Sequence, residues 1–135
     1  MSNYVVYTDG AYSAMRNQGA IAFIILKDNK CVSRFSKIIN NTTNQRAEQL
    51  ACIYALESIK TPSNVTIYSD SAYVVNTYNA GWKRKANLDL WDRLDKAKDK
   101  HNVTFIHVKG HSDNLYNNLC DFLATNEGKE EVSES

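Results

Sequence analysis

The stretch YVVYTDG, residues 4–10, joins a strand pattern to a carboxylate and a glycine. Its first five residues are tyrosine, valine and threonine, which favour a β-strand. Asp9 follows at once, and a carboxylate beside an apolar run is rare unless something pairs with it. The stretch NVTIYSD at 64–70 repeats this arrangement and places Asp70 after a second strand pattern. A helical crossover precedes it, so the two predicted strands are parallel and carry their carboxylates at one edge of a sheet.

The rest of the chain predicts a mixed α/β fold around these two strands. Two alternating apolar runs are joined by the turn pair at 28–29 and form an antiparallel meander with the first strand. The resulting order βββαβααβα predicts a five-stranded sheet, three strands antiparallel and then two parallel, with helices on both faces. The remaining elements are strands at 19–27, 30–39 and 103–108, and helices at about 45–59, 71–79, 88–97 and 114–125, the first of them opened by a capping box at Thr42.

Length and composition fit one globular domain. With 135 residues, 43% of them hydrophobic and 23% charged, the chain is ordinary for a soluble protein, and its net charge of +1 does not by itself indicate nucleic acid. We expect a domain over 1–127 and a disordered polar tail over 128–135. Three cysteines without a CxxC pair favour free thiols in a reducing, cytoplasmic setting. No stretch is apolar for long enough to span a membrane, and no signal-peptide pattern is present.

Four carboxylates fall where the predicted fold would bring them together: Asp9, Glu48, Asp70 and Asp121. Glu48 interrupts the apolar face of the first helix, and Asp121 lies in the apolar stretch LCDFLA at 119–124. Ligands of such sheets gather outside the carboxyl ends of the parallel strands. Two unit charges ~4 Å apart repel by about 4 kcal/mol at an effective dielectric near 20, so a cluster of carboxylates needs cations. Hard divalent metals and phosphate chemistry are therefore the leading hypothesis.

Each acid also has a plain structural explanation. Asp9 followed by glycine is commonly a turn, Asp70 before a serine is commonly a helix cap, and Glu48 would face solvent if the helix phase were shifted by one residue. The hypothesis of a metal site depends on the joint pattern rather than on any one residue.

Six segments together make the chain resemble type 1 ribonuclease H over residues 4–126. They occur in that family's order and spacing, in a short form that lacks the family's basic protrusion and any separate hybrid-binding domain. The segments are YTDG (7–10), TNQRAE (43–48), YSDSAYV (68–74), NLDLW (87–91), VKGHSD (108–113) and NLCDFLA (118–124).

The resemblance implies an endonuclease that hydrolyses the RNA strand of RNA–DNA hybrids with two Mg²⁺ ions, Mn²⁺ being an alternative, and leaves 5′-phosphate and 3′-hydroxyl ends. Asp9 would bridge both ions, Glu48 and Asp70 would hold one, and Asp121 the other. His111 occupies the position of a mobile histidine that shuttles protons or helps release product, and a near-neutral pKa suits either role.

The resemblance also implies how the hybrid is held. Gly10, Asn44, Gln45 and Ser71 would lie along the RNA strand, where the 2′-hydroxyl distinguishes RNA from DNA. Gln45 stands where a second asparagine is usual, and Ala72 where glutamine is common, so some RNA contacts differ.

On the DNA strand, Thr43 and Asn87 would form a phosphate pocket, without the arginine that often stands at Asn41. The connector GWKRKA at 81–86 would place Trp82 against a sugar and its cations on phosphates. We expect weak, salt-sensitive binding to the hybrid.

Two other functions stay open. Another nuclease with the same fold would share the acids but not the NQRAE (44–48) and KGHS (109–112) segments. A non-catalytic hybrid-binding module would have no reason to keep anions beside a phosphate. We expect a monomer, and the sequence leaves open whether it acts beside a replication polymerase or comes from a cell or a virus.

Overall fold

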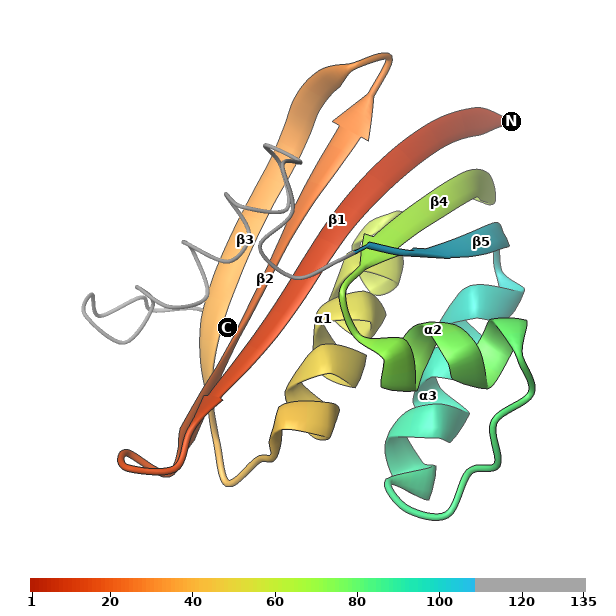
Figure 1. Ribbon diagram of the computed structural model, residues 1–135. Helices are drawn as coiled ribbons and strands as arrows, with labels where there is room; N and C mark the ends of the chain where they lie inside the picture. The colour runs from red at the N-terminus through yellow and green to blue at the C-terminus, as the bar shows by residue number, and fades with distance from the viewer. Residues whose placement is uncertain (109–135) are drawn as a thin grey trace.

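The computed structural model describes residues 1–108, which form a five-stranded sheet and three helices (Figure 1). The spatial order of strands is β3-β2-β1-β4-β5, with β1, β2 and β3 antiparallel and β1, β4 and β5 parallel. The elements are β1 (Ser2–Ser13), β2 (Gln18–Lys27), β3 (Lys30–Asn40), α1 (Asn44–Ser58), β4 (Ser63–Ser69), α2 (Ala72–Asn79), α3 (Leu88–Asp99) and β5 (Asn102–His107).

This topology confirms the predicted mixed sheet and the element order as far as β5. The helix predicted over 114–125 and the tail predicted over 128–135 lie outside the described residues. Among residues 1–108, no helix has both the length and the apolar character that crossing a membrane would require.

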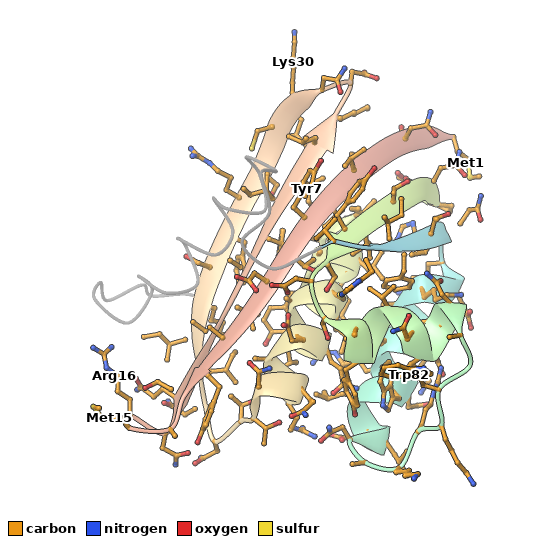
Figure 2. The ribbon with its side chains drawn as sticks, viewed as in Figure 1. Met1, Tyr7, Met15, Arg16, Lys30 and Trp82 are labelled. Carbon is orange, nitrogen blue, oxygen red and sulfur yellow. The ribbon has the colours of Figure 1, made fainter. Side chains whose placement is uncertain are left out.

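β1 is the central strand and it is longer than its sequence pattern predicts. Its parallel pairing with β4 ends where Thr8 meets Ser69, which leaves Asp9 and Asp70 next to each other in register. β1 then continues to Ser13, paired only with β2. Asp9 therefore comes just after the last parallel pair but lies inside the strand, because β2 continues to pair with β1 where β4 stops. The β1–β2 hairpin projects beyond this point and carries Met15 and Arg16 at its tip (Figure 2).

The main core lies between the sheet and the three described helices. Val6, Ile67 and Phe105 face it from the strands, and the alternation of side chains places Tyr7 and Tyr68 in a second cluster on the opposite face. All three helices contribute to the first cluster, so they cover the same face of the sheet. Trp91 of α3 is 1% exposed and belongs to this core.

Two of the three described helices begin at a hydroxyl cap. Thr43, and not Thr42, caps α1: its hydroxyl accepts a hydrogen bond from the backbone N–H of Arg46 at 3.2 Å. Thr42 is buried instead, and a Cβ at Gly19 would lie 2.5 Å from its methyl carbon. Ser71 caps α2 through the N–H of Val74, also at 3.2 Å. The capping box predicted at Thr42 is therefore wrong by one residue. The side chain of Thr42 packs against Gly19 of β2 and does not cap α1.

Candidate active site

The site begins at the contact between β1 and α1, where Gly10 allows the two backbones to meet. A Cβ on Gly10 would lie 2.6 Å from the carbonyl carbon of Ala47 and 2.6 Å from the backbone nitrogen of Glu48. Any other residue would push α1 away from the strand. Beside this contact, Thr8 Oγ1 lies 3.7 Å from Cys52 Sγ, one helical turn beyond Glu48. The glycine after Asp9 therefore sets how closely Glu48 approaches it.

Three of the four predicted carboxylates converge at this contact. Asp9 of β1, Glu48 of α1 and Asp70 after β4 each offer an oxygen, and the three oxygens lie within 4.8 Å of one another. Asp9 is 4% exposed and Glu48 is 7% exposed, and Asp70 is half-buried. Asp9 lies within β1, Asp70 directly follows the neighbouring strand β4, and the glutamate comes from the helix that covers them. Asp121 and His111, the other predicted catalytic residues, lie outside the described residues.

The electrostatics of the cluster are unfavourable without a cation. Burial, and then the charges of Asp70 and Asp9, raise the pKa of Glu48 well above its usual value, although the backbone N–H of Gly10 opposes the shift. One oxygen of Glu48, Oε1, is buried and accepts no hydrogen bond from any of residues 1–108. A buried acceptor without a donor costs free energy, and a cation would satisfy it. Three converging carboxylates are the oxygen donors that Mg²⁺ and similar hard cations prefer, so the residues fit such an ion.

The residues predicted to meet the RNA strand surround the start of α1 and α2. Asn44 and Gln45 are exposed in the first turn of α1, next to the cap residue Thr43. Ser71 is only 7% exposed and its hydroxyl accepts the capping hydrogen bond of α2. The side chains of Asn44 and Gln45 are thus open to a ligand, whereas that of Ser71 is largely used by the fold.

The residues predicted to meet the DNA strand lie at the start of α3 and in the connector before it. Asn87 is the residue before α3, in the left-handed region at φ 57°, and its side chain makes no capping bond to that helix. Trp82 is 49% exposed (Figure 2). In Figure 1 the β1–β2 hairpin, the start of α1 and the connector lie along one side of the molecule.

Arg84 corrects one expectation about the connector. Its guanidinium binds the carboxylate of Asp95 at 2.6 and 3.0 Å, and it also lies 5.1 Å from the centre of the Trp91 ring. The same carboxylate accepts a hydrogen bond from Tyr78 at 2.8 Å. Arg84 therefore anchors the connector to α3, and Lys83 and Lys85 remain as its exposed cations. An arginine with an internal carboxylate partner is poorly placed to neutralise a phosphate.

Sequence reasoning assigned no role to three further residues that border the site. Arg46 and Asp89 form a two-point ion pair between α1 and α3, and His107 Nε2 lies 3.3 Å from the carbonyl oxygen of Asp70. Arg46 and Asp89 lie in two of the segments that carry the resemblance. Nothing in either segment alone shows that they touch, because they are 43 residues apart in the chain.

Comparisons with known proteins agree with this fold. The family model for RNase H matches residues 1–129. Ribonuclease H of Acetivibrio thermocellus is 42% identical and ribonuclease H of Caldanaerobacter subterraneus subsp. tengcongensis is 40% identical. Each alignment covers 96% of this chain, with 97% and 94% of the respective relative.

A solved structure of similar fold is LC11-RNase H1 in complex with an RNA/DNA hybrid. Its TM-score is 0.79 at 22% identity, covering 91% of this chain and 94% of the neighbour. The match to the family model, the two relatives and the converging carboxylates lead to one conclusion: this chain belongs to the ribonuclease H family of hydrolases.

Proposed function

We propose that this protein is an endonuclease that hydrolyses the RNA strand of RNA–DNA hybrids by a two-metal-ion mechanism. The products would be 5′-phosphate and 3′-hydroxyl ends. The observation that carries the proposal is the meeting of Asp9, Glu48 and Asp70, whose oxygens lie within 4.8 Å of one another. Membership of the ribonuclease H family and the hybrid bound to the structural neighbour LC11-RNase H1 support the choice of substrate.

The carboxylates would hold Mg²⁺, with Mn²⁺ as an alternative. Two such ions, when bound, neutralise the phosphate and lower the pKa of the attacking water. Asp9, Glu48 and Asp70 provide the ligands, and we propose Asp121 as the fourth. Glu48 has to be ionised in order to bind a cation, so its raised pKa couples metal binding to the release of a proton. We propose that His111 moves a proton or helps the product leave.

The hybrid would lie across the starts of α1 and α3. On the RNA side, the amides of Asn44 and Gln45 can each donate and accept hydrogen bonds, which suits a 2′-hydroxyl. Gly10 and Ser71 are the other proposed RNA contacts, and Ala72 offers no side-chain donor or acceptor. On the DNA side, we propose that Thr43 and Asn87 bind one phosphate and that Trp82 packs against a sugar. With Arg84 bound to Asp95 and Asn41 neutral, the connector and this pocket offer few cations to the phosphates, so binding should be weak. The part of the binding that Lys83 and Lys85 supply should fall as the salt concentration rises.

Substrate choice tests the proposal. End-labelled RNA–DNA hybrid, duplex DNA and duplex RNA are each incubated with the protein and Mg²⁺, beside an Asp70→Asn variant. Cleavage of only the RNA strand of the hybrid, lost in the variant, is expected. Cutting of duplex DNA would favour another nuclease of this fold. Hybrid binding without cleavage by the wild type would favour a binding module.

A further inference from the structure

We propose that Arg46 is a positioning residue: it fixes the side-chain amide of Asn87 so that this amide presents one N–H to the DNA phosphate. The inference rests on the proposed function, since it concerns how the same site holds the hybrid. It assigns a role to the ion pair of Arg46 with Asp89, which the proposed chemistry does not use.

The guanidinium of Arg46 is held by three contacts. Its two terminal nitrogens donate to the two carboxylate oxygens of Asp89 at 3.0 and 2.9 Å. The first of them, Nη1, also donates to Oδ1 of Asn87 at 3.3 Å. A two-point guanidinium–carboxylate pair has a fixed plane, so Asp89 determines where the second N–H of Nη1 points. That N–H points at the amide of Asn87.

These contacts decide which way round the amide of Asn87 sits. Arginine has only donors, so the atom of Asn87 that faces it must be the amide oxygen. The amide nitrogen then lies on the other side, where it donates one hydrogen to the hydroxyl of Tyr73 at 3.1 Å. An amide nitrogen has two hydrogens, and the second stays available. With the amide turned over, the carbonyl oxygen would face the phosphate and repel it.

The backbone at the start of α3 makes this orientation possible. An asparagine before a helix usually turns its side chain back to cap the first turn. Asn87 does not: its backbone is in the left-handed region and no side-chain capping bond forms. Its side chain is held by Arg46 of α1 and Tyr73 of α2 instead. α3 therefore has no side-chain cap from Asn87, and residues of α1 and α2 hold the side-chain amide of Asn87 in place.

Arg46 acts here by geometry more than by charge. Its carboxylate partner makes the pair neutral overall, and the guanidinium side chain is only 30% exposed. A lysine would keep the charge but could not hold Asp89 and Asn87 at the same time in the plane that the guanidinium provides. Arg46→Lys should therefore behave like Arg46→Gln and not like the wild type.

A second ion pair between the same helices provides a matched control. Arg93 of α3 binds the carboxylate of Glu57 of α1 at 2.8 and 2.7 Å. Glu57 is eleven residues after Arg46, so it lies ~16 Å further along α1, away from the site. Arg93→Gln breaks an ion pair of the same kind between the same two helices. It does not touch Asn87.

The test uses the full chain and a series of hybrids in which one DNA phosphate at a time is an uncharged methylphosphonate. For each hybrid, kcat and KM of RNA cleavage are measured in wild type, Asn87→Ala, Arg46→Gln, Arg46→Lys and Arg93→Gln. In the wild type, one neutralised linkage should raise KM roughly tenfold, the size expected for losing a charged hydrogen bond, with kcat little changed. Asn87→Ala, Arg46→Gln and Arg46→Lys should reduce that ratio to about twofold, whereas Arg93→Gln should keep it.

The outcomes separate the two proposals. A wild type that does not cleave the hybrid contradicts the proposed function. A wild type that cleaves, while Arg46→Gln keeps the full sensitivity to the same linkage, overturns the positioning role, as does a scan without any sensitive linkage. Should Arg46→Gln fail to fold by circular dichroism, Asp89→Asn serves in its place, because it leaves Arg46 present but no longer held in one plane.

Discussion

Two groups of carboxylates in this protein are treated in opposite ways. On the outer surface of α1 and α3, Glu57, Asp89 and Asp95 each bind the guanidinium of one arginine. Where the parallel pairing of β1 and β4 ends, Asp9, Glu48 and Asp70 crowd one another in a largely buried position. The pKa of Asp89 is lowered to about 2, chiefly by its hydrogen bonds to Arg46, whereas the pKa of Glu48 is raised by burial and by the neighbouring acids.

The difference distinguishes carboxylates that are each paired with an arginine from carboxylates that are crowded against one another. An exposed ion pair contributes at most about 1 kcal/mol to stability, and the chain can replace it at small cost. A buried cluster of like charges lowers stability, so it is expected only where a cation or a substrate uses it.

Neutralising one acid from each group should separate them by activity. Asp70→Asn removes a proposed metal ligand, and kcat for hybrid cleavage should fall at least about a thousandfold, since metal ions supply several kcal/mol of transition-state stabilisation. Glu57→Gln, at the far end of α1, should change kcat less than about twofold. Steady-state cleavage assays in Mg²⁺ provide both numbers. Equal losses of kcat in Asp70→Asn and Glu57→Gln would show that the clustered carboxylates matter no more for cleavage than the paired ones.

Gly10→Ala should disrupt the contact that brings Glu48 to the cluster. The new methyl group would meet the backbone of α1 at 2.6 Å, so α1 must shift, and the free energy of unfolding should fall by about 3 kcal/mol. Urea unfolding measures it. Gly81→Ala is the control: φ there is +68° but nothing lies within 4 Å, so only the backbone strain of about 1 kcal/mol is expected. A smaller loss at Gly10 than at Gly81 would show that close packing is not what this glycine provides.

The two groups should also differ in how stability depends on pH. Glu48 has a raised pKa when folded, so the folded state binds the extra proton and metal-free stability should fall as pH rises above about 4.5. Asp89 has a lowered pKa, so its contribution is present above about pH 4 and is lost toward pH 2. Urea unfolding in chelator between pH 4 and 8 checks the first effect. Glu48→Gln should flatten that slope, and an unchanged slope would assign it to other groups.

Much of the fold and of the site follows from the sequence, because local pattern decides the strands and helices. The apolar alternation of β2 and the stretches that end at Asp9 and Asp70 place the sheet and two of its acids. The resemblance to ribonuclease H supplies the roles of the site residues, and all of these roles stay predictions.

What sequence reasoning misses depends on tertiary contacts. The extension of β1 to Ser13 depends on pairing with its antiparallel partner β2. Thr43 caps α1 because the side chain of Thr42 packs against β2. The sequence predicts that Arg84 binds a phosphate, because the pattern does not show that Arg84 pairs with Asp95 of α3. Arg46 and Asp89 meet only once α1 and α3 have packed together.

The central claim is that the clustered carboxylates are kept for a cation and not for the fold. Thermal unfolding of the wild type and Asp70→Asn, each in chelator and in Mg²⁺, tests it most directly. In chelator the variant should melt at the higher temperature, because one of the crowded charges is gone. Mg²⁺ should then raise the melting temperature of the wild type more than that of the variant. Equal melting temperatures in chelator, together with no effect of Mg²⁺ on either protein, would contradict the account.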